Sequence, residues 1–214
     1  MRTIKKVASH IFIDGFGGMT QGLFATLIIG TMIQQIGLLI GGSTGNVIYL
    51  LGKAAAALTS AGIGVGVAVK YGESPLVTVS AAVAAMVGGY AGKITGGTFF
   101  VDGNAVLAGP GEPLGAFIAA FAGITCGHLV SGKTKVDIIV TPVITIGAGS
   151  VVGLLVGPPI SQMMTGLGSI INWATEQRPF IMGIVVSVVM GMVLTLPISS
   201  AAVSYTHLTL PTIA

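Results

Sequence analysis

Residues 15–52 read GFGGMTQGLFATLIIGTMIQQIGLLIGGSTGNVIYLLG, and none of these 38 residues is charged. A helix rises about 1.5 Å per residue, so about 20 residues are needed to cross the roughly 30 Å of hydrocarbon in a bilayer. The stretch is too long for one crossing and too short for two full crossings joined by a turn. It has to break, and the glycine-rich run 41–46 predicts the position of the break.

The whole chain is also rich in hydrophobic residues and poor in charged ones. Of the 214 residues, 7% are charged and 53% are hydrophobic, whereas about a quarter of the residues in soluble domains are charged. Such a chain could not cover its exterior with polar groups, which excludes a water-soluble globule. The nine Lys and Arg residues are scattered, so no basic surface for nucleic acid is expected. The single cysteine, Cys126, excludes an internal disulfide and a cysteine-based metal cluster.

Gaps between charged residues mark the remaining membrane spans. We predict an all-α fold: a polytopic transmembrane helical bundle of about six spans, with one or two re-entrant or interfacial segments. The predicted spans are Gly18–Leu39, Val47–Val69, Pro75–Gly92, Pro113–Val130, Ile138–Val156 and Phe180–Ile198. The run Gly157-Pro158-Pro159 is expected to end the fifth span, because proline interrupts helical hydrogen bonding.

The basic residues predict the orientation, because cytoplasmic loops carry an excess of Lys and Arg. A cytoplasmic N-terminus gives the inner face six basic residues: Arg2, Lys5, Lys6, Lys70, Lys133 and Lys135. The outer face then receives only Lys93 and Arg178. The counts are consistent with a multi-pass protein whose N-terminus is cytoplasmic.

Two segments differ from simple spans. Residues 93–112 mix five glycines with apolar pairs, a pattern that fits either a re-entrant hairpin beside a solute path or a solvated outer loop. Residues 160–175 form a two-faced helix, with the polar residues Ser161, Gln162, Thr165, Ser169, Asn172 and Glu176 recurring on one side. This helix is expected to lie in the interface or to turn its polar face toward a cavity.

Two further patterns have structural explanations. Glycines recur four residues apart in most spans, which predicts close packing of helix backbones. Residues 127–134 read GHLVSGKT and match the phosphate-binding pattern G-x-x-x-x-G-K-[ST]. That pattern requires a strand before the loop and a soluble helix after it, whereas here two membrane spans flank it. We interpret the match as accidental.

Polar residues inside or beside a membrane are costly, which makes them candidates for function. Five are predicted to bind substrate: Asp102, Asn104, Glu112, Asn172 and Glu176. Glu112 is favoured, because it lies at the mouth of a span and its carboxylate can accept hydrogen bonds from sugar hydroxyls. The alternative for each is an ordinary loop or interfacial residue. No catalytic residue, metal site or cofactor is predicted.

Longer strings carry a resemblance to a known family. They are LFATLIIGTMIQQIG (23–37), AGIGVGVA (61–68), GPGEPLGAFIAA (109–120), HLVSGKTKVDIIVTPVITI (128–146) and the segment 156–202, which contains GPPISQMMTGLGSIINWATEQRPF. Together they resemble a bacterial phosphotransferase-system EIIC sugar permease of the stand-alone branch. The likeness covers nearly all of residues 1–203, which we treat as one transmembrane domain.

The resemblance implies a function and partners. It implies a permease in the bacterial inner membrane that binds a sugar in a central cavity and passes it to a phosphorylated IIB protein. The IIA protein supplies the phosphoryl group of IIB. Homodimers within membrane lipid are typical of such permeases, and the IIC part is not catalytic alone. The Gly-Ile-Thr-Glu motif of better-studied sugar permeases is absent from this sequence, so no catalytic residue is carried over.

The end of the chain departs from this pattern. Residues 204–214 read SYTHLTLPTIA and resemble a foreign tail, where members of the branch continue with further apolar spans. The sequence therefore predicts a chain truncated at its C-terminus. Two alternative functions remain at this point: a secondary transporter or channel for a small polar solute without phosphoryl coupling, and a membrane-embedded regulator.

Overall fold

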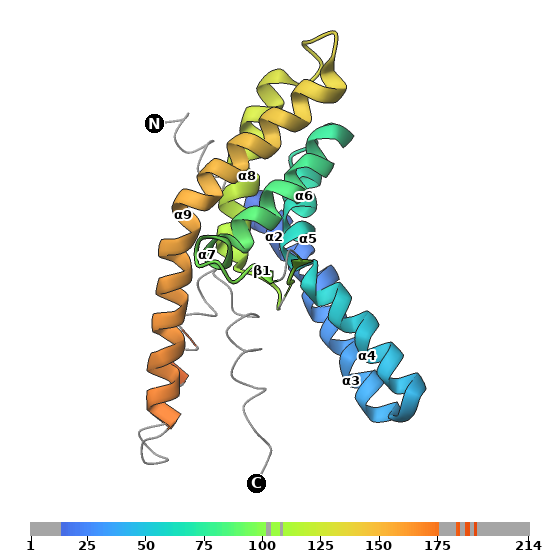
Figure 1. Ribbon diagram of the computed structural model, residues 1–214, viewed down its shortest axis with the longest axis vertical. Helices are drawn as coiled ribbons and strands as arrows, with labels where there is room; N and C mark the ends of the chain where they lie inside the picture. Colours follow the sequence, from blue (N-terminus) through green and yellow to red (C-terminus); the bar gives the residue numbers. More distant parts are fainter. Residues whose placement is uncertain are drawn as a thin grey trace.

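The computed structural model describes residues 14–101, 104–107, 109–175, 183–184, 187–188 and 191. Over these residues the fold is all-α, as predicted, with one very short hairpin (Figure 1). The helices are α2 (Phe16–Leu23), α3 (Ile29–Ile40), α4 (Gly42–Ala57), α5 (Thr59–Lys70), α6 (Pro75–Gly89), α7 (Ala91–Thr95), α8 (Pro113–Val130) and α9 (Asp137–Thr175). A π-helical turn, η2 (Phe24–Ile28), joins α2 to α3, and the strands β1 (Phe100–Val101) and β2 (Asn104–Ala105) pair antiparallel.

Three described helical segments are long and apolar enough to cross a membrane: Phe16–Ile40, Pro113–Val130 and Asp137–Ser169. The pair α4 and α5 counts as a fourth if it forms a single bent span. The first predicted span and the fourth are therefore confirmed, the fourth with identical bounds. The predicted sixth span lies almost entirely outside the described residues.

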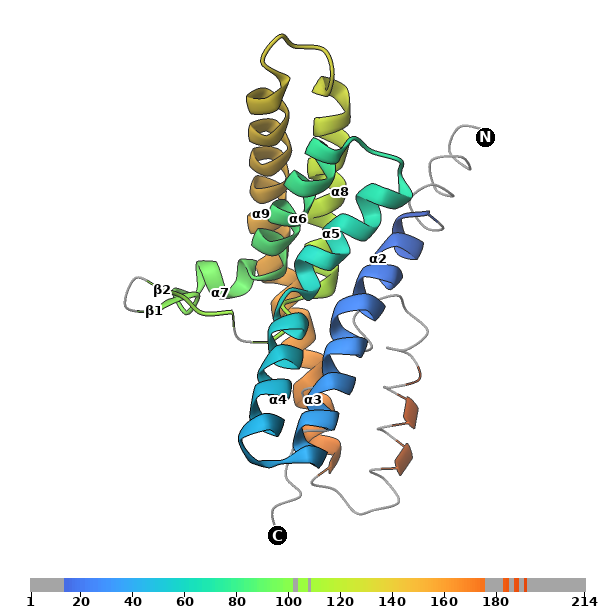
Figure 2. The same cartoon turned by 90° about the vertical axis from the view of Figure 1, so that its right-hand side faces the viewer.

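The turn between the first and second predicted spans is tighter than predicted. Helix α4 begins at Gly42, so most of the predicted breaker 41–46 is helical. Gly41 alone separates α3 from α4, and its φ of +65° is a conformation that glycine adopts without strain. The result is an antiparallel hairpin of α3 and α4 that extends from the rest of the bundle (Figure 2).

The second predicted span, Val47–Val69, contains a break that the sequence analysis did not anticipate. Helices α4 and α5 meet at Leu58 with a bend of 52°. The Thr59 hydroxyl donates to the Ala56 carbonyl oxygen at 2.6 Å, and the Tyr90 hydroxyl lies 3.2 Å from the Ala57 oxygen. The Thr59 hydroxyl therefore bonds a carbonyl group at the interruption, and the Tyr90 hydroxyl lies beside the next carbonyl along the chain.

The prediction that Gly157-Pro158-Pro159 ends the fifth span is wrong. Helix α9 continues through both prolines to Thr175 and has 39 residues, which corresponds to a length of about 58 Å. Its axis changes direction partway along (Figure 1), the usual effect of proline within a helix. The polar segment 160–175 is therefore the second half of this helix and not a separate interfacial helix.

Glycines bring the helix backbones into contact, as predicted. A Cβ on Gly18 would lie 2.6 Å from the Gly66 oxygen, where α2 crosses α5. A Cβ on Gly115 would lie 2.6 Å from the Gly88 oxygen, where α8 crosses α6. Without a hydrophobic driving force in lipid, such close approach is a main source of helix association.

The core lies where α2, α5, α6 and α8 meet. Its largest members include Met19, Ile63, Phe117 and Ile124, all at most 5% exposed. Phe16 stacks on Phe117 with ring centroids 4.9 Å apart, which joins the start of α2 to α8. The many exposed apolar side chains lie outside this core, on surfaces suited to lipid.

Two loops are joined at one end of the bundle. Glu73, before α6, and His128, near the end of α8, approach to 3.0 Å. The hydroxyls of Ser74 and Ser131 are 3.0 Å apart. The α8–α9 turn therefore lies with the α5–α6 turn, while the α3–α4 turn lies at the opposite end of the molecule (Figure 2).

Candidate functional site

Three interruptions of helical structure meet inside the bundle. They are the bend at Leu58, the end of α6 at Gly89 and Tyr90, and the loop 109–112 before α8. We call these residues the break cluster. Helix ends expose polar backbone groups, and transporters commonly use discontinuous helices to build their substrate sites.

The loop 109–112 is held by long-range hydrogen bonds. The Glu112 amide donates to the Gly89 oxygen at 2.7 Å, and the Ser60 hydroxyl donates to the Pro110 oxygen at 3.0 Å. The Tyr90 hydroxyl donates to the Gly109 oxygen. These contacts fix the position of Glu112 relative to α5 and α6.

Gly111 allows the loop to approach this closely. Its φ is +74°, and a Cβ there would lie 2.5 Å from the Ser60 hydroxyl oxygen. A side chain at this position would be strained and would also separate the loop from α5. The motif Gly109-Pro110-Gly111-Glu112 thus places a carboxyl group at the start of α8.

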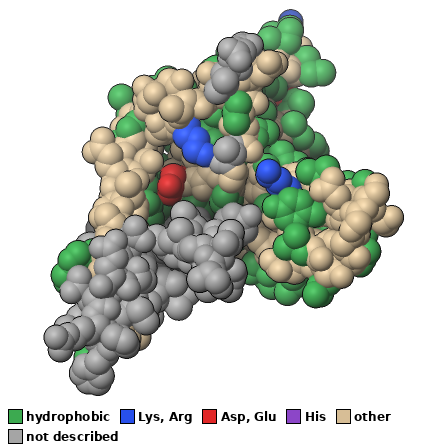
Figure 3. All heavy atoms as spheres, turned by 60° about the horizontal axis from the view of Figure 1, so that its bottom comes forward, with side chains coloured by type: hydrophobic (Ala, Val, Ile, Leu, Met, Phe, Trp, Pro, Cys, Tyr) green, Lys and Arg blue, Asp and Glu red, His purple; other side chains and the backbone are tan. Residues whose placement is uncertain are grey.

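Glu112 and Lys93 interact electrostatically across the site. Burial raises the pKa of the Glu112 carboxyl, and the positive charge of Lys93 acts in the opposite direction. Burial lowers the pKa of the Lys93 ammonium, and the Glu112 charge opposes this shift. Acidic and basic side chains gather around a recess on the face of the molecule shown in Figure 3. Each charge therefore reduces the cost of burying the other.

Tyr90 connects Lys93 to the break cluster. The Lys93 Nζ lies 5.3 Å from the centroid of the Tyr90 ring, within the range of a cation–π interaction. Tyr90 is 1% exposed, and burial raises the pKa of its hydroxyl to about 12. The hydroxyl therefore stays protonated and remains a hydrogen-bond donor over the physiological pH range.

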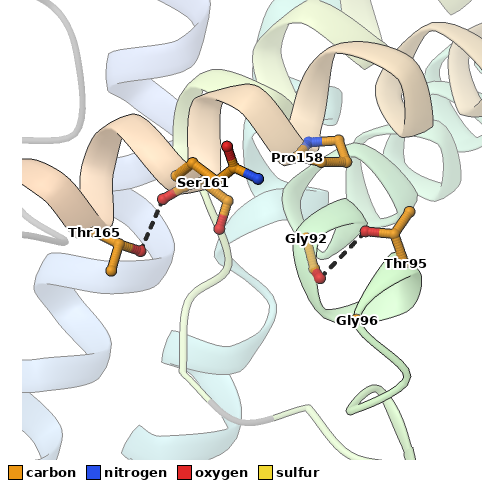
Figure 4. A pocket seen from close by; sticks show the side chains of 7 residues that line it. Gly92, Thr95, Gly96, Pro158, Ser161 and Thr165 are labelled. Atoms are coloured by element: carbon orange, nitrogen blue, oxygen red, sulfur yellow. Dashed lines mark hydrogen bonds between the residues drawn. The ribbon is translucent and has the colours of Figure 1, made fainter.

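A cavity of about 400 Å³ lies between α7 and α9 (Figure 4). It is lined by Gly92, Thr95, Gly96, Pro158, Ser161, Gln162 and Thr165. Gly157 packs against Ala91, so α7 meets α9 next to the two prolines. We call this space the α7–α9 cavity.

The structure places two of the five predicted binding residues. Glu112 is half-buried in the break cluster, and Asn104 is exposed on β2. Asp102 and Glu176 lie outside the described residues. Asn172 lies in α9, at a position whose side chain is also outside the description.

Sequence reasoning missed several residues around Glu112. Lys93 was assigned to the outer face as an orientation signal, and Tyr90 and Ser60 were given no role. Their partners are carbonyl or carboxyl groups up to 50 residues away, so no local pattern identifies them. The polar residues that α9 contributes to the cavity belong to the helical stripe that begins at Ser161.

The structure also bears on the phosphate-loop match. Gly127–Val130 is the last turn of α8, so a helix and not a strand precedes the turn that contains Lys133. This agrees with the interpretation of the match as accidental. Among the residues described, no three or more His, Cys, Asp or Glu side chains group together to hold a metal ion.

Comparison with known proteins supplies the family. The family model described as "Phosphotransferase system, EIIC" matches residues 13–211, which is most of the chain. No curated protein and no solved structure gave a match. The apolar helices agree with a membrane protein of this kind. The chain therefore belongs to the EIIC family of the phosphotransferase system, and it is an integral membrane component of a sugar permease.

Proposed function

We propose that this chain binds a sugar at the break cluster and translocates it for phosphorylation by a phosphorylated IIB partner. IIB in turn receives its phosphoryl group from IIA. Membership of the EIIC family supports the partners and the substrate class. One structural observation carries the choice of site. The loop that carries Glu112 is held at the meeting point of three helix interruptions, close enough to Lys93 for the two charges to interact, within a bundle that is otherwise largely apolar.

The chemistry of the pair suits a neutral polyol. An ionised carboxylate accepts hydrogen bonds from two hydroxyl groups, and an ammonium group donates to hydroxyl oxygens. Because Glu112 and Lys93 offset each other's charge, a sugar can bind there without bringing a charge of its own. Asn104, Asp102, Asn172 and Glu176 remain proposed contacts of the same substrate.

The orientation belongs to the same proposal. The N-terminal end of α2 lies beside the Lys70 side chain, and the α5–α6 and α8–α9 turns share one end of the bundle. Lys70, Lys133 and Lys135 are therefore grouped toward the end of the bundle where α2 begins, which supports a cytoplasmic N-terminus. The bacterial inner membrane and a homodimer complete the arrangement that we propose.

Proteoliposomes test the proposed function. The full chain is reconstituted with IIA, IIB and a phosphoryl donor on one side, and a tritiated sugar is supplied on the other. We expect the sugar to accumulate as its phosphate only when IIB is present. Accumulation of the free sugar without IIB would contradict the proposal and would indicate a secondary transporter.

A substitution tests the assigned site. Glu112→Gln removes the charge but keeps the size, and we expect it to lower sugar affinity by about tenfold or more. Glu73→Gln is the matched control, because Glu73 lies at the end of the bundle and contacts His128. Equal affinities in the two variants would remove Glu112 from the site.

A further inference from the structure

The residues that line the α7–α9 cavity do not include Glu112 or Lys93. Gly92, Thr95 and Gly96 of α7 line the cavity, whereas the Lys93 ammonium lies over the Tyr90 ring. Its volume of about 400 Å³ is within the range of small-molecule sites. The cavity therefore has room for a ligand that the pair at the break cluster does not account for.

The lining of the cavity combines polar and apolar surface and carries no charged side chain. None of its seven lining residues is Asp, Glu, Lys, Arg or His. The Thr165 hydroxyl donates to the Ser161 oxygen at 2.9 Å (Figure 4). The Thr95 hydroxyl lies 2.9 Å from the Ala91 oxygen and 3.3 Å from the Gly92 oxygen, and Figure 4 draws the contact with Gly92. Because both protons are engaged, these hydroxyl oxygens face a ligand as acceptors. The Gln162 amide adds two donors and one acceptor.

The position of the cavity makes its polar side chains significant. Pro158, Ser161, Gln162 and Thr165 all lie within Asp137–Ser169, a segment apolar enough to span a membrane. Polar side chains in such a segment are costly unless they meet a partner or water. Gly92 allows α7 and α9 to approach closely beside the cavity, since a Cβ there would lie 2.7 Å from the Ser161 hydroxyl oxygen.

We propose that the α7–α9 cavity is a subsite that binds hydroxyl groups of the unphosphorylated sugar, through Gln162 and the acceptor oxygens of Thr95 and Thr165. The inference rests on the proposed function and adds the part of the site that selects a neutral ligand. A phosphate group would lose its hydration there without gaining a cation, because no lining side chain carries a positive charge. The subsite therefore favours the free sugar over its phosphate.

Binding measurements on the purified full chain test the subsite. Tritiated hexoses, hexitols and disaccharides are titrated first against the unmodified chain. The best ligand is then titrated against Gln162→Leu and Thr165→Val. The matched control is Thr125→Val, because Thr125 is also an exposed threonine that donates to the carbonyl four residues earlier, here on α8. Elution profiles verify that each variant is folded.

We expect about tenfold weaker binding in Gln162→Leu, several-fold weaker binding in Thr165→Val and no change in Thr125→Val. The 6-phosphate of the bound sugar should compete at least tenfold less well than the free sugar. Normal affinity in both cavity variants would overturn the subsite while leaving the proposed function intact. Equal competition by the sugar phosphate would overturn the selection of a neutral ligand. If no sugar binds to the unmodified chain, both proposals fail.

Discussion

At the scale of single residues, the Glu112 carboxyl is the most informative group in the chain. Its backbone amide is bound to Gly89, so its position is fixed by α6 and not only by α8. Burial raises its pKa and Lys93 lowers it. The protonation state of Glu112 therefore depends on the presence of Lys93, which makes the pair testable by pH.

The Lys93→Met variant should shift the pH dependence of sugar binding. Removing the positive charge takes away the effect that lowers the pKa of Glu112, so this pKa rises further. As the pH falls, the carboxylate is then lost at a higher pH. We expect the acidic limb of sugar affinity to move to higher pH in Lys93→Met.

Titrations of sugar affinity from pH 4 to pH 8 measure this shift. Lys70→Met is the control, because it removes a lysine at the end of α5 instead of the one beside Glu112. An acidic limb that stays in place in Lys93→Met would show that sugar binding does not depend on this carboxylate.

Ser60 should control the loop that carries Glu112. Ser60→Ala removes the hydrogen bond to Pro110, and we expect faster hydrogen exchange at the Glu112 amide and weaker sugar binding. Ser80→Ala is the matched control, because Ser80 is also buried but donates only to Leu76 of its own helix. Exchange at Glu112 that is equally fast in both variants would show that Ser60 does not hold the loop.

Sequence reasoning marked Glu112 as a candidate but did not predict its environment. The motif Gly109-Pro110-Gly111-Glu112 is local, and its glycines and prolines marked a special conformation at the start of a span. Lys93, Tyr90 and Ser60 act through contacts between distant segments, and such contacts leave no periodic signal. The stripe at Ser161, Gln162 and Thr165 was visible, but the α7 residues that face it were not.

At the scale of helices, close glycine contacts explain how the elements associate. A Cβ on Gly22 would collide with the Gly62 carbonyl of α5. The backbone fixes the position of a Cβ, and the atoms that it would meet are backbone atoms of α5. A rotamer change therefore cannot relieve the collision, and the helices themselves would have to move apart.

We therefore expect Gly22→Ala to lower the free energy of unfolding by about 1–3 kcal/mol. Gly147→Ala in α9 is the control, because a Cβ there meets nothing within 4 Å. Its better helix propensity should leave stability unchanged or increase it by up to about 1 kcal/mol. Thermal unfolding in detergent compares the two variants. Equal stability would contradict the packing observed between α2 and α5.

The helix boundaries were predictable where the signal was strong. Pro113–Val130 is bounded by a proline and a polar turn, and its prediction is confirmed. Pro158 and Pro159 were read as a stop, yet α9 continues through them with Gly157 packed on α7. The bend at Leu58 has no proline or glycine beside it, so no breaker residue predicts it. The Thr59 hydroxyl bonds the Ala56 carbonyl there, and the Tyr90 hydroxyl lies 3.2 Å from the Ala57 oxygen.

At the scale of the whole molecule, a lipid-embedded permease requires an apolar exterior and a water-filled site within the bundle. Leu155 is 72% exposed and faces outward, while Ser161, six residues later on α9, lines the α7–α9 cavity and is half-buried. In water, the more exposed position would be the more reactive one. In a bilayer the order reverses, because lipid covers Leu155 and water reaches Ser161.

Thiol labelling in sealed vesicles decides between these possibilities. The only native cysteine is replaced in Cys126→Ala, and Ser161→Cys and Leu155→Cys are compared with a membrane-impermeant methanethiosulfonate reagent. We predict rapid labelling at position 161, slowed by sugar, and little labelling at position 155. Faster labelling at position 155 than at position 161 would contradict a lipid-embedded permease with a water-filled site.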